Sequence, residues 1–382
     1  MTSAAVDSRT TGENARRILT RDPNPFLFRA MHFRSVTVKN RITLSPMCQY
    51  FGEDGCPNDW HFVHLGARAS GGSAIVFTEV VHTEARGRIT PFCLGLWNDT
   101  QEHLFKKIAD FIAQQGAIPA MQIGHAGRKA SVARPWEGSK PISISEGGWE
   151  TIGPSPHAYA DGWPVPKELS IADIEQLIET FVEAARRALR AGFKIIELHA
   201  AHGYLIHQFL SPLSNHRTDR YGGSFENRCR LLRDVISQVR TVWPEDLGLF
   251  VRISASDWVE GGWSLDDTIA LATELKTSGR IDLIDCSSGG NDPRQQIPIH
   301  PGYQVPFSSV VREKAEIATG AVGLIHSPEL AESILANGQA DLIFLGRALL
   351  ADPNWPMRAA AQLKAKSFRW PLQYERGSIY FG

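Results

Sequence analysis

The chain has 382 residues, of which 43% are hydrophobic and 21% charged, and its formal net charge is −1. This composition is typical of a globular protein with a sizeable core. A nearly neutral chain without a basic block is a poor partner for nucleic acid or an anionic membrane. No apolar run approaches the roughly 20 residues that a membrane-spanning helix needs.

The first 25 residues are polar, contain four arginines, and lack the apolar core of a secretory signal. They predict a flexible N-terminal arm, with a transit peptide as the alternative. The five cysteines form no CxxC pair, and an odd number without a signal peptide favours reduced thiols. We therefore expect a cytoplasmic protein.

From Phe26 onward, short apolar runs alternate with longer amphipathic stretches, which is the rhythm of a parallel α/β sheet. Residues 36–40 precede the first expected strand and predict a small N-terminal hairpin beneath the sheet. The expected strands are 42–44, 74–77, 118–121, 195–198, 249–251, 283–286, a run near 321–322, and 342–345. The expected helices are about 60–71, 99–115, 171–191, 225–243, 265–278, 307–318, 328–337 and 347–365.

Eight strands that are each followed by a helix predict a single (β/α)8 TIM barrel over residues 26–366. A doubly wound sheet is the competing fold, but no GxGxxG motif follows the first strand. Residues 124–169 form a long insertion after strand three, rich in Gly, Pro, Ser and Trp. Such a long irregular segment favours a lid or wall over a functional site.

In a barrel the active site lies at the carboxyl ends of the strands, so the residues just after each strand should face one another. These residues are Cys48, Tyr50, Gln122, His199, His202, Tyr204, Arg252, Gly323, Gly346 and Arg347. Two imidazoles three positions apart suit gripping a carbonyl oxygen, and Tyr204 adds a phenolic proton beside them. His207 also suggests zinc, but no second cluster completes a four-ligand set, so we expect no metal.

The turns after strands seven and eight resemble the phosphate site common to barrels. Backbone N–H groups at Gly323 and Gly346 would meet the phosphate, and Arg347 could add a charged fork. Between this anchor and the histidines there is room for a flat cofactor. Gln122 could hydrogen-bond a ring carbonyl and a ring N–H, and Arg252 could place positive charge near an anionic reduced ring.

Several sequence blocks carry a family resemblance. They are residues 39–42 and 45–50 (KNRI and SPMCQY), 124–129 (GHAGRK), 199–205 (HAAHGYL), 215–224 (NHRTDRYGGS), 320–325 (GAVGLI), 345–347 (LGR) and 373–377 (QYERG). In order and spacing they resemble the Old Yellow Enzyme family of FMN-dependent ene-reductases. The resemblance is to its bacterial xenobiotic-reductase-like branch, often labelled NADPH dehydrogenase.

This resemblance implies bound FMN, reduced by NADPH or NADH, and hydride transfer to an activated alkene such as an enone, maleimide or nitroalkene. It implies that His199 and His202 hold the substrate oxygen and that Tyr204 supplies the proton. Tyr50 and Arg376 would also face the substrate, and Cys48 would modulate the flavin potential. The implied FMN contacts are Ser45, Pro46, Met47, Cys48, Val80, Gln122, Arg252, Gly323, Gly346 and Arg347.

The resemblance further implies a homodimer or homotetramer with the C-terminal tail, residues 367–382, at a subunit interface. The chain departs from the pattern at Val80, where a smaller residue is frequent, and in the tail beyond Arg376. A flavin-free barrel acting on phosphosugars or through a metal remains an alternative, as does a dienoyl-CoA reductase type. The absence of clustered cysteines for an iron–sulfur centre speaks against the latter.

Overall fold

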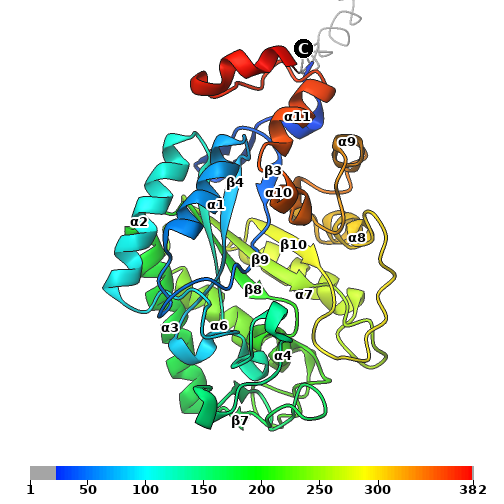
Figure 1. The fold of residues 1–382 in the computed structure, drawn as a ribbon. Coiled ribbons are helices and arrows are strands. Elements are labelled where there is room, and N and C mark those ends of the chain that lie inside the picture. Colours follow the sequence, from blue (N-terminus) through cyan, green and yellow to red (C-terminus); the bar gives the residue numbers. More distant parts are fainter. Residues whose placement is uncertain (1–22, 381–382) are drawn as a thin grey trace, which may run out of the picture.

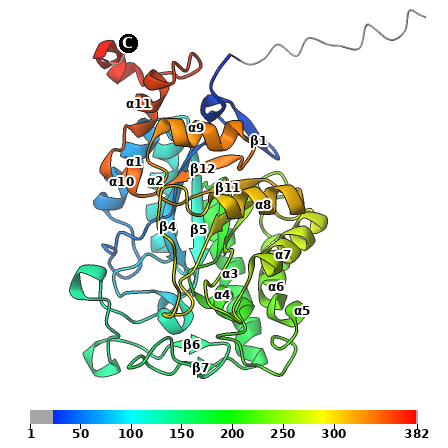
Figure 2. The same cartoon turned by 90° about the vertical axis from the view of Figure 1, so that its right-hand side faces the viewer.

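Residues 23–380 are described by a computed structural model, in which eight parallel strands close into a barrel (Figures 1 and 2). Going round the barrel the strands are β3 (Ile42–Leu44), β4 (Ile75–His82), β5 (Ile118–Gly124), β8 (Ile195–Ala200), β9 (Gly248–Ser254), β10 (Leu283–Ser287), β11 (Thr319–Ala321) and β12 (Leu342–Leu345). β12 pairs with β3 and closes the ring. The predicted TIM barrel is confirmed, and strand seven begins two residues before its predicted position.

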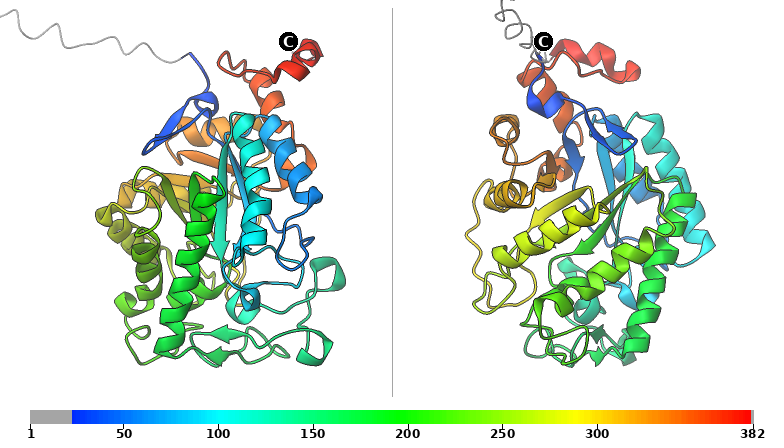
Figure 3. Two further views of the ribbon diagram at one scale, coloured as in Figure 1. Left: turned by 90° about the vertical axis from the view of Figure 1, so that its left-hand side faces the viewer. Right: turned by 180° about the vertical axis from the view of Figure 1, so that it is seen from behind.

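Helices surround the barrel on its outer face in all views (Figure 3). They are α1 (Asp59–Ser70), α2 (Asp99–Gln114), α3 (Ile171–Arg190), α4 (Leu205–Leu210), α5 (Phe225–Arg228), α6 (Arg230–Val239), α7 (Leu265–Ser278), α8 (Val305–Ala315), α9 (Pro328–Ala336), α10 (Arg347–Ala351) and α11 (Trp355–Gln362). Side chains cap the starts of α1, α2, α3 and α7 by accepting backbone N–H groups that the helix itself leaves free.

Two predicted helices are interrupted, and one short helix was not predicted. The stretch expected at 225–243 divides into α5 and α6 at Cys229. The stretch expected at 347–365 divides into α10 and α11, because Pro353 disfavours helical geometry at the residue before it and lacks an N–H donor. α4 lies immediately after the histidine turn, in a segment too short for a periodic pattern.

The N-terminal hairpin lies at the amino end of the barrel. It consists of β1 (Met31–Phe33) and β2 (Val36–Val38), and the Ser35 N–H donates to Asp246 O (3.1 Å) just before β9. The Phe33 ring packs edge-on against Phe250 in the barrel, with centroids 4.9 Å apart. The hairpin therefore forms part of the barrel floor, as predicted.

The insertion after β5 covers the carboxyl end of the barrel. It is irregular apart from single 3-10 turns and the small pair β6 (Ile152–Gly153) and β7 (Lys167–Glu168), at the foot of Figure 2. Trp149 Nε1 donates to Arg86 O (2.8 Å), in the loop after β4. The Arg217 guanidinium, in the loop after α4, donates to Pro154 O (2.9 Å) and Leu169 O (2.6 Å). These bonds attach the insertion to two other loops of the same end.

The C-terminal tail lies at the opposite end of the barrel (Figures 1 and 3). Its last element is a 3-10 helix over Leu372–Tyr380. A cleft of about 630 Å³ separates the tail from Gly72 and Gly116, which precede β4 and β5. The predicted arm 1–25 falls outside the described residues except for its last three. Within residues 23–380 no helix combines the length and the apolarity that crossing a bilayer requires.

Candidate active site

Residues from the carboxyl ends of several strands surround a cavity of about 400 Å³. This volume lies within the roughly 300–1,000 Å³ typical of small-molecule sites. Of the residues predicted for the site, the cavity is lined by Ser45, Pro46, Met47, His202, Arg252, Gly323, Gly346 and Arg347. Ser287, Tyr303 and Gln304 also line it, although the sequence did not single them out.

The turn after β8 holds three rings together. The His199 ring lies 5.1 Å from the His202 ring and 5.1 Å from the Tyr204 ring, edge-on to both. His202 and Gly203 both have positive φ, which reverses the chain within two residues. A Cβ on Gly203 would lie 2.1 Å from Gly290 O, so only glycine allows this close approach.

Both histidines are held in the neutral state. Burial, followed by the charge of Arg252, lowers the pKa of His199 and His202 well below the usual range. The Ala201 N–H donates to His199 Nδ1 (3.3 Å), so the proton of that ring belongs on Nε2. His202 Nε2 lies 2.7 Å from Ser287 Oγ. Neutral imidazole N–H groups can donate to a substrate oxygen without the cost of burying a cation.

A second group of predicted residues includes Tyr204 and packs together beside the histidine turn. Cys48, Tyr50 and Tyr204 pack against an apolar cluster that includes Val80 and Cys93. A hydrogen bond with the Cys93 thiol, then burial, raises the pKa of Cys48 well above its ordinary value. Burial, then Cys48, raises the pKa of Tyr204. Both groups are therefore protonated at neutral pH, and Tyr204 has a proton to give.

Gln122 and Arg252 lie in a buried polar layer within the barrel. Gln122 Nε2 donates to Glu197 Oε1 (2.8 Å), and Arg252 Nε lies 3.1 Å from Asp285 Oδ2. Glu197 and Asp285 lie in the predicted strands 195–198 and 283–286, but no role was predicted for them. Their signal was nonetheless present, because an acid inside an apolar strand run is costly to bury unless it is paired.

The predicted phosphate end is also assembled. Gly323 has φ +122°, and Gly346 directly precedes α10. Arg347 is exposed at the edge of the cavity, and no carboxylate in residues 23–380 forms an ion pair with it. The Arg347 guanidinium at one end suits the phosphate of FMN, and the cavity between it and the neutral His202 has room for the ring system.

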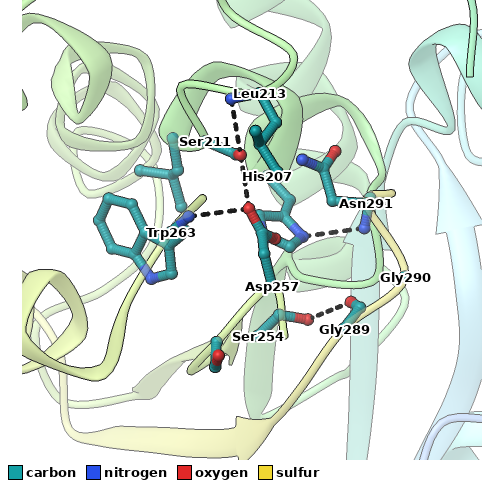
Figure 4. Close-up of polar contacts among 12 residues, drawn as sticks. His207, Ser211, Leu213, Ser254, Asp257, Trp263, Gly289, Gly290 and Asn291 are labelled. Carbon is teal, nitrogen blue, oxygen red and sulfur yellow. Dashed lines mark hydrogen bonds and ion pairs between the residues drawn. The ribbon is translucent and has the colours of Figure 1, made fainter. Parts of the chain in front are cut away.

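The cavity is not lined by six other predicted residues, Cys48, Tyr50, Val80, Gln122, His199 and Tyr204. Two residues lie in other parts of the fold. His207, the third histidine of the stretch, is fully buried against Asp257, with Nε2 and Oδ1 2.9 Å apart (Figure 4 shows their surroundings). Arg376 is exposed in the tail, at the opposite end of the barrel. Within one chain Arg376 does not reach the site, and its predicted entry into a neighbouring subunit stays a prediction.

Comparisons with known proteins agree with this geometry. Residues 26–366 match the family described as "NADH:flavin oxidoreductase / NADH oxidase family". The NADPH dehydrogenase of Geobacillus thermodenitrificans (strain NG80-2) is 45% identical over 356 residues, 93% of this chain and 99% of the relative. The NADPH dehydrogenase of Bacillus subtilis (strain 168) is 45% identical over 353 residues, 92% of this chain and 98% of the relative.

Solved structures show the same architecture. The Old Yellow Enzyme homologue of Zymomonas mobilis has a TM-score of 0.73 at 25% identity, covering 91% of this chain and 98% of its own. Morphinone reductase in complex with tetrahydroNAD has a TM-score of 0.72 at 24% identity, with 90% and 92% covered, and supports the fold alone.

The resemblance to Old Yellow Enzyme is thus confirmed, and the flavin-free alternative is set aside. The enzyme uses FMN, with NAD(P)H as the electron donor. On the match over residues 26–366 and the 45% identity to NADPH dehydrogenases, the chain belongs to the NADH:flavin oxidoreductase / NADH oxidase family.

Proposed function

We propose that this protein is an ene-reductase that reduces the C=C bond of activated alkenes such as enones, maleimides and nitroalkenes. The observation that carries the proposal is the neutral pair His199 and His202 beside a protonated Tyr204, with His202 lining the cavity. FMN held by the residues around the cavity would supply the hydride for the β-carbon of the alkene, with NAD(P)H as the source of that hydride.

The two histidines act as donors to the carbonyl or nitro oxygen of the substrate. Donors aimed at an oxygen on which negative charge develops lower the barrier more than they strengthen substrate binding. His199 offers its Nε2–H, because its Nδ1 already accepts from Ala201. His202 Nε2 faces Ser287 Oγ, and a substrate oxygen would compete with this hydroxyl.

Tyr204 delivers the proton to the α-carbon. Its ring is edge-on to His199, so the proton source lies next to the oxygen-binding group. The raised pKa keeps the phenol protonated through the physiological range. Tyr50, in the same apolar cluster as Tyr204, lines the substrate side.

FMN is held by the predicted set around the cavity and by three residues beside it, Cys48, Val80 and Gln122. Cys48→Ala should move the midpoint potential of the flavin and leave turnover measurable. A redox titration checks this expectation, and an unmoved midpoint would argue against contact between the thiol and the ring. Cys229→Ala, at another buried free cysteine between α5 and α6, is the matched control and should leave the midpoint unchanged.

In solution we propose a homodimer or homotetramer, in which the C-terminal tail carries Arg376 toward a neighbouring site. Arg376→Ala should then raise KM, while a monomer in light scattering would contradict this part of the proposal. The cytoplasmic location stays a prediction from cysteine usage.

The deciding experiment is an anaerobic two-step reaction with the purified holoenzyme. NADPH or NADH first bleaches the flavin band, and 2-cyclohexenone, N-methylmaleimide or a nitroalkene is then added. Reoxidation of the flavin with formation of the saturated product supports the proposal. Flavin that is reduced by NADPH but not reoxidised by any of the three alkene classes would contradict it.

A further inference from the structure

Two fully buried carboxylates, Glu197 on β8 and Asp285 on β10, flank the strand that carries Arg252. In the register of the barrel Asp285 is directly opposite Arg252. Neither oxygen of Asp285 accepts a hydrogen bond from any residue in the described part of the chain. Its partner is the Arg252 guanidinium, 3.1 Å away at Nε.

Arg252 also lines the cavity, so its guanidinium lies between Asp285 and whatever the cavity holds. The positive charge presented to a bound ring therefore depends on whether Asp285 is ionised. Glu197 has a different partner, because its Oε1 accepts from the side-chain amide of Gln122 (2.8 Å). Asp285 thus contacts the charged Arg252 guanidinium, whereas Glu197 contacts the Gln122 amide.

We propose that Asp285 is a positioning residue that sets the reduction potential of bound FMN by neutralising Arg252, whereas Glu197 only fixes the orientation of the Gln122 amide. The inference rests on the proposed placement of the flavin ring against Arg252. A positive charge beside the ring favours the reduced, more anionic form. An ionised Asp285 cancels part of that charge and keeps the potential low.

The ionisation states of the two acids support this division. Burial raises the pKa of Asp285 to about 6, with Arg252 acting in the opposite direction. Burial, then Asp285, raises the pKa of Glu197 well above its ordinary value. At pH 8 Asp285 is therefore charged, whereas burial favours the protonated form of Glu197.

Among the groups around the site, Lys129 also gains charge below pH 8, because burial lowers its pKa to about 7. Its Nζ lies over the Tyr204 ring, 5.3 Å from the centroid, and donates to His202 O rather than to Asp285. Glu197 and Arg252 are the ionisable side chains next to Asp285 on β8 and β9, and β11 contributes only Thr319, Gly320 and Ala321 on the other side. His199 and His202 also face Arg252, and burial together with the charge of Arg252 lowers the pKa of both well below the usual range, which favours their neutral form. As the pH falls through about 6, Asp285 becomes neutral and the charge of Arg252 is exposed.

The test compares two isosteric amides, Asp285→Asn and Glu197→Gln, in the FMN-loaded enzyme. Redox titration at pH 8 should show a higher midpoint for Asp285→Asn. We expect reduced FMN to gain about tenfold in binding over oxidised FMN, which is about 30 mV for a two-electron couple. Glu197→Gln should leave the midpoint at its wild-type value. Equal shifts in both variants, or no shift in Asp285→Asn, would overturn the inference.

A second measurement needs no variant. In the wild-type enzyme the midpoint, referred to that of free FMN, should rise additionally as the pH falls through about 6, where Asp285 becomes neutral. This step lies below the pKa of about 7 at which Lys129 gains its charge. A constant difference would overturn the inference even if Asp285→Asn does not fold. Alkene turnover enters neither measurement, so an enzyme that shows the shift but reduces no alkene would contradict the proposed function alone.

Discussion

His202 lies in the turn after β8 and His207 in the helix α4 that follows it, yet of the two only His207 has a carboxylate partner among residues 23–380. His202 lines the cavity, has no carboxylate partner among residues 23–380, and is held neutral by burial and Arg252. His207 is fully buried, donates toward Asp257, and accepts the Gly203 N–H on its other nitrogen (2.9 Å). Both ring nitrogens of His207 are therefore engaged within the protein.

Asp257 explains why the second environment is structural. Its Oδ2 accepts from Ser211 Oγ (2.5 Å) and from the Trp263 N–H (2.8 Å), so this acid joins three segments at the carboxyl end of the barrel (Figure 4). Gly203, which donates to His207, lies between His202 and Tyr204. His207 therefore supports the turn that brings His202 to the cavity, and the Asp257 carboxylate distinguishes the first histidine from the second.

The largest expected effect comes from removing the displayed pair. His199→Ala combined with His202→Ala should lower kcat/KM for an enone by at least about 10²–10³, the loss seen when oxyanion donors are removed. The flavin content should stay unchanged. His103→Ala, at an exposed site on α2, is the matched control and should behave as wild type. Unchanged turnover in the double variant would remove the histidines from the mechanism.

Breaking the structural pair should act on stability instead. Asp257→Asn removes the charge beside His207 and puts an amide donor or a single oxygen where two acceptor oxygens meet His207, Ser211 and Trp263. We expect a loss of about 3 kcal/mol in the free energy of unfolding. Urea unfolding of the variant and of His103→Ala measures the difference. If Asp257→Asn is as stable as wild type, the pair does not hold the turn.

Tyr204→Phe sharpens the distinction within the site, because it removes a proton and leaves the ring packing on His199. Loss of a general acid typically costs 10²-fold or more, and solvent can partly replace a phenol, so we expect about 10²-fold at most. Stopped-flow measurement should place the loss in flavin reoxidation by the alkene. Slower reduction by NADPH would instead indicate a packing defect.

A smaller effect is expected in the pH dependence of stability, which tests the Asp257–His207 pair and not the cavity. Burial opposes ionisation of Asp257, but His207 and the hydrogen bonds of Ser211 and Trp263 outweigh it and lower the pKa of Asp257. A carboxyl with a lowered native pKa stabilises the fold above its unfolded pKa of about 3.9, and this stabilisation is lost as the pH falls through the native value. The gap in unfolding free energy between wild type and Asp257→Asn should therefore narrow between pH 5 and pH 3. A gap that is constant over this range would contradict the lowered pKa.

Much of the site was predictable because the barrel has a rule for its active end. Apolar runs such as 342–345 predict buried strands, and the residue after each run must then lie at the carboxyl end. This reasoning placed His202, Arg252 and Arg347 around one cavity. It could not find the role of Asp285, since pairing with Arg252 depends on the register between two strands.

The sequence by itself determined that eight apolar runs form a barrel and that His202, Arg252 and Arg347 follow three of them, because burial periodicity and strand ends are local properties of the chain. The tertiary structure alone decided which of three neighbouring histidines has an acid partner, and that Arg376 lies at the far end from its own site. Asp257 and His207 are far apart in the chain, and only the folded loops bring them within 2.9 Å. Charge state follows from such contacts, so the division between displayed and supporting histidines appears only in three dimensions.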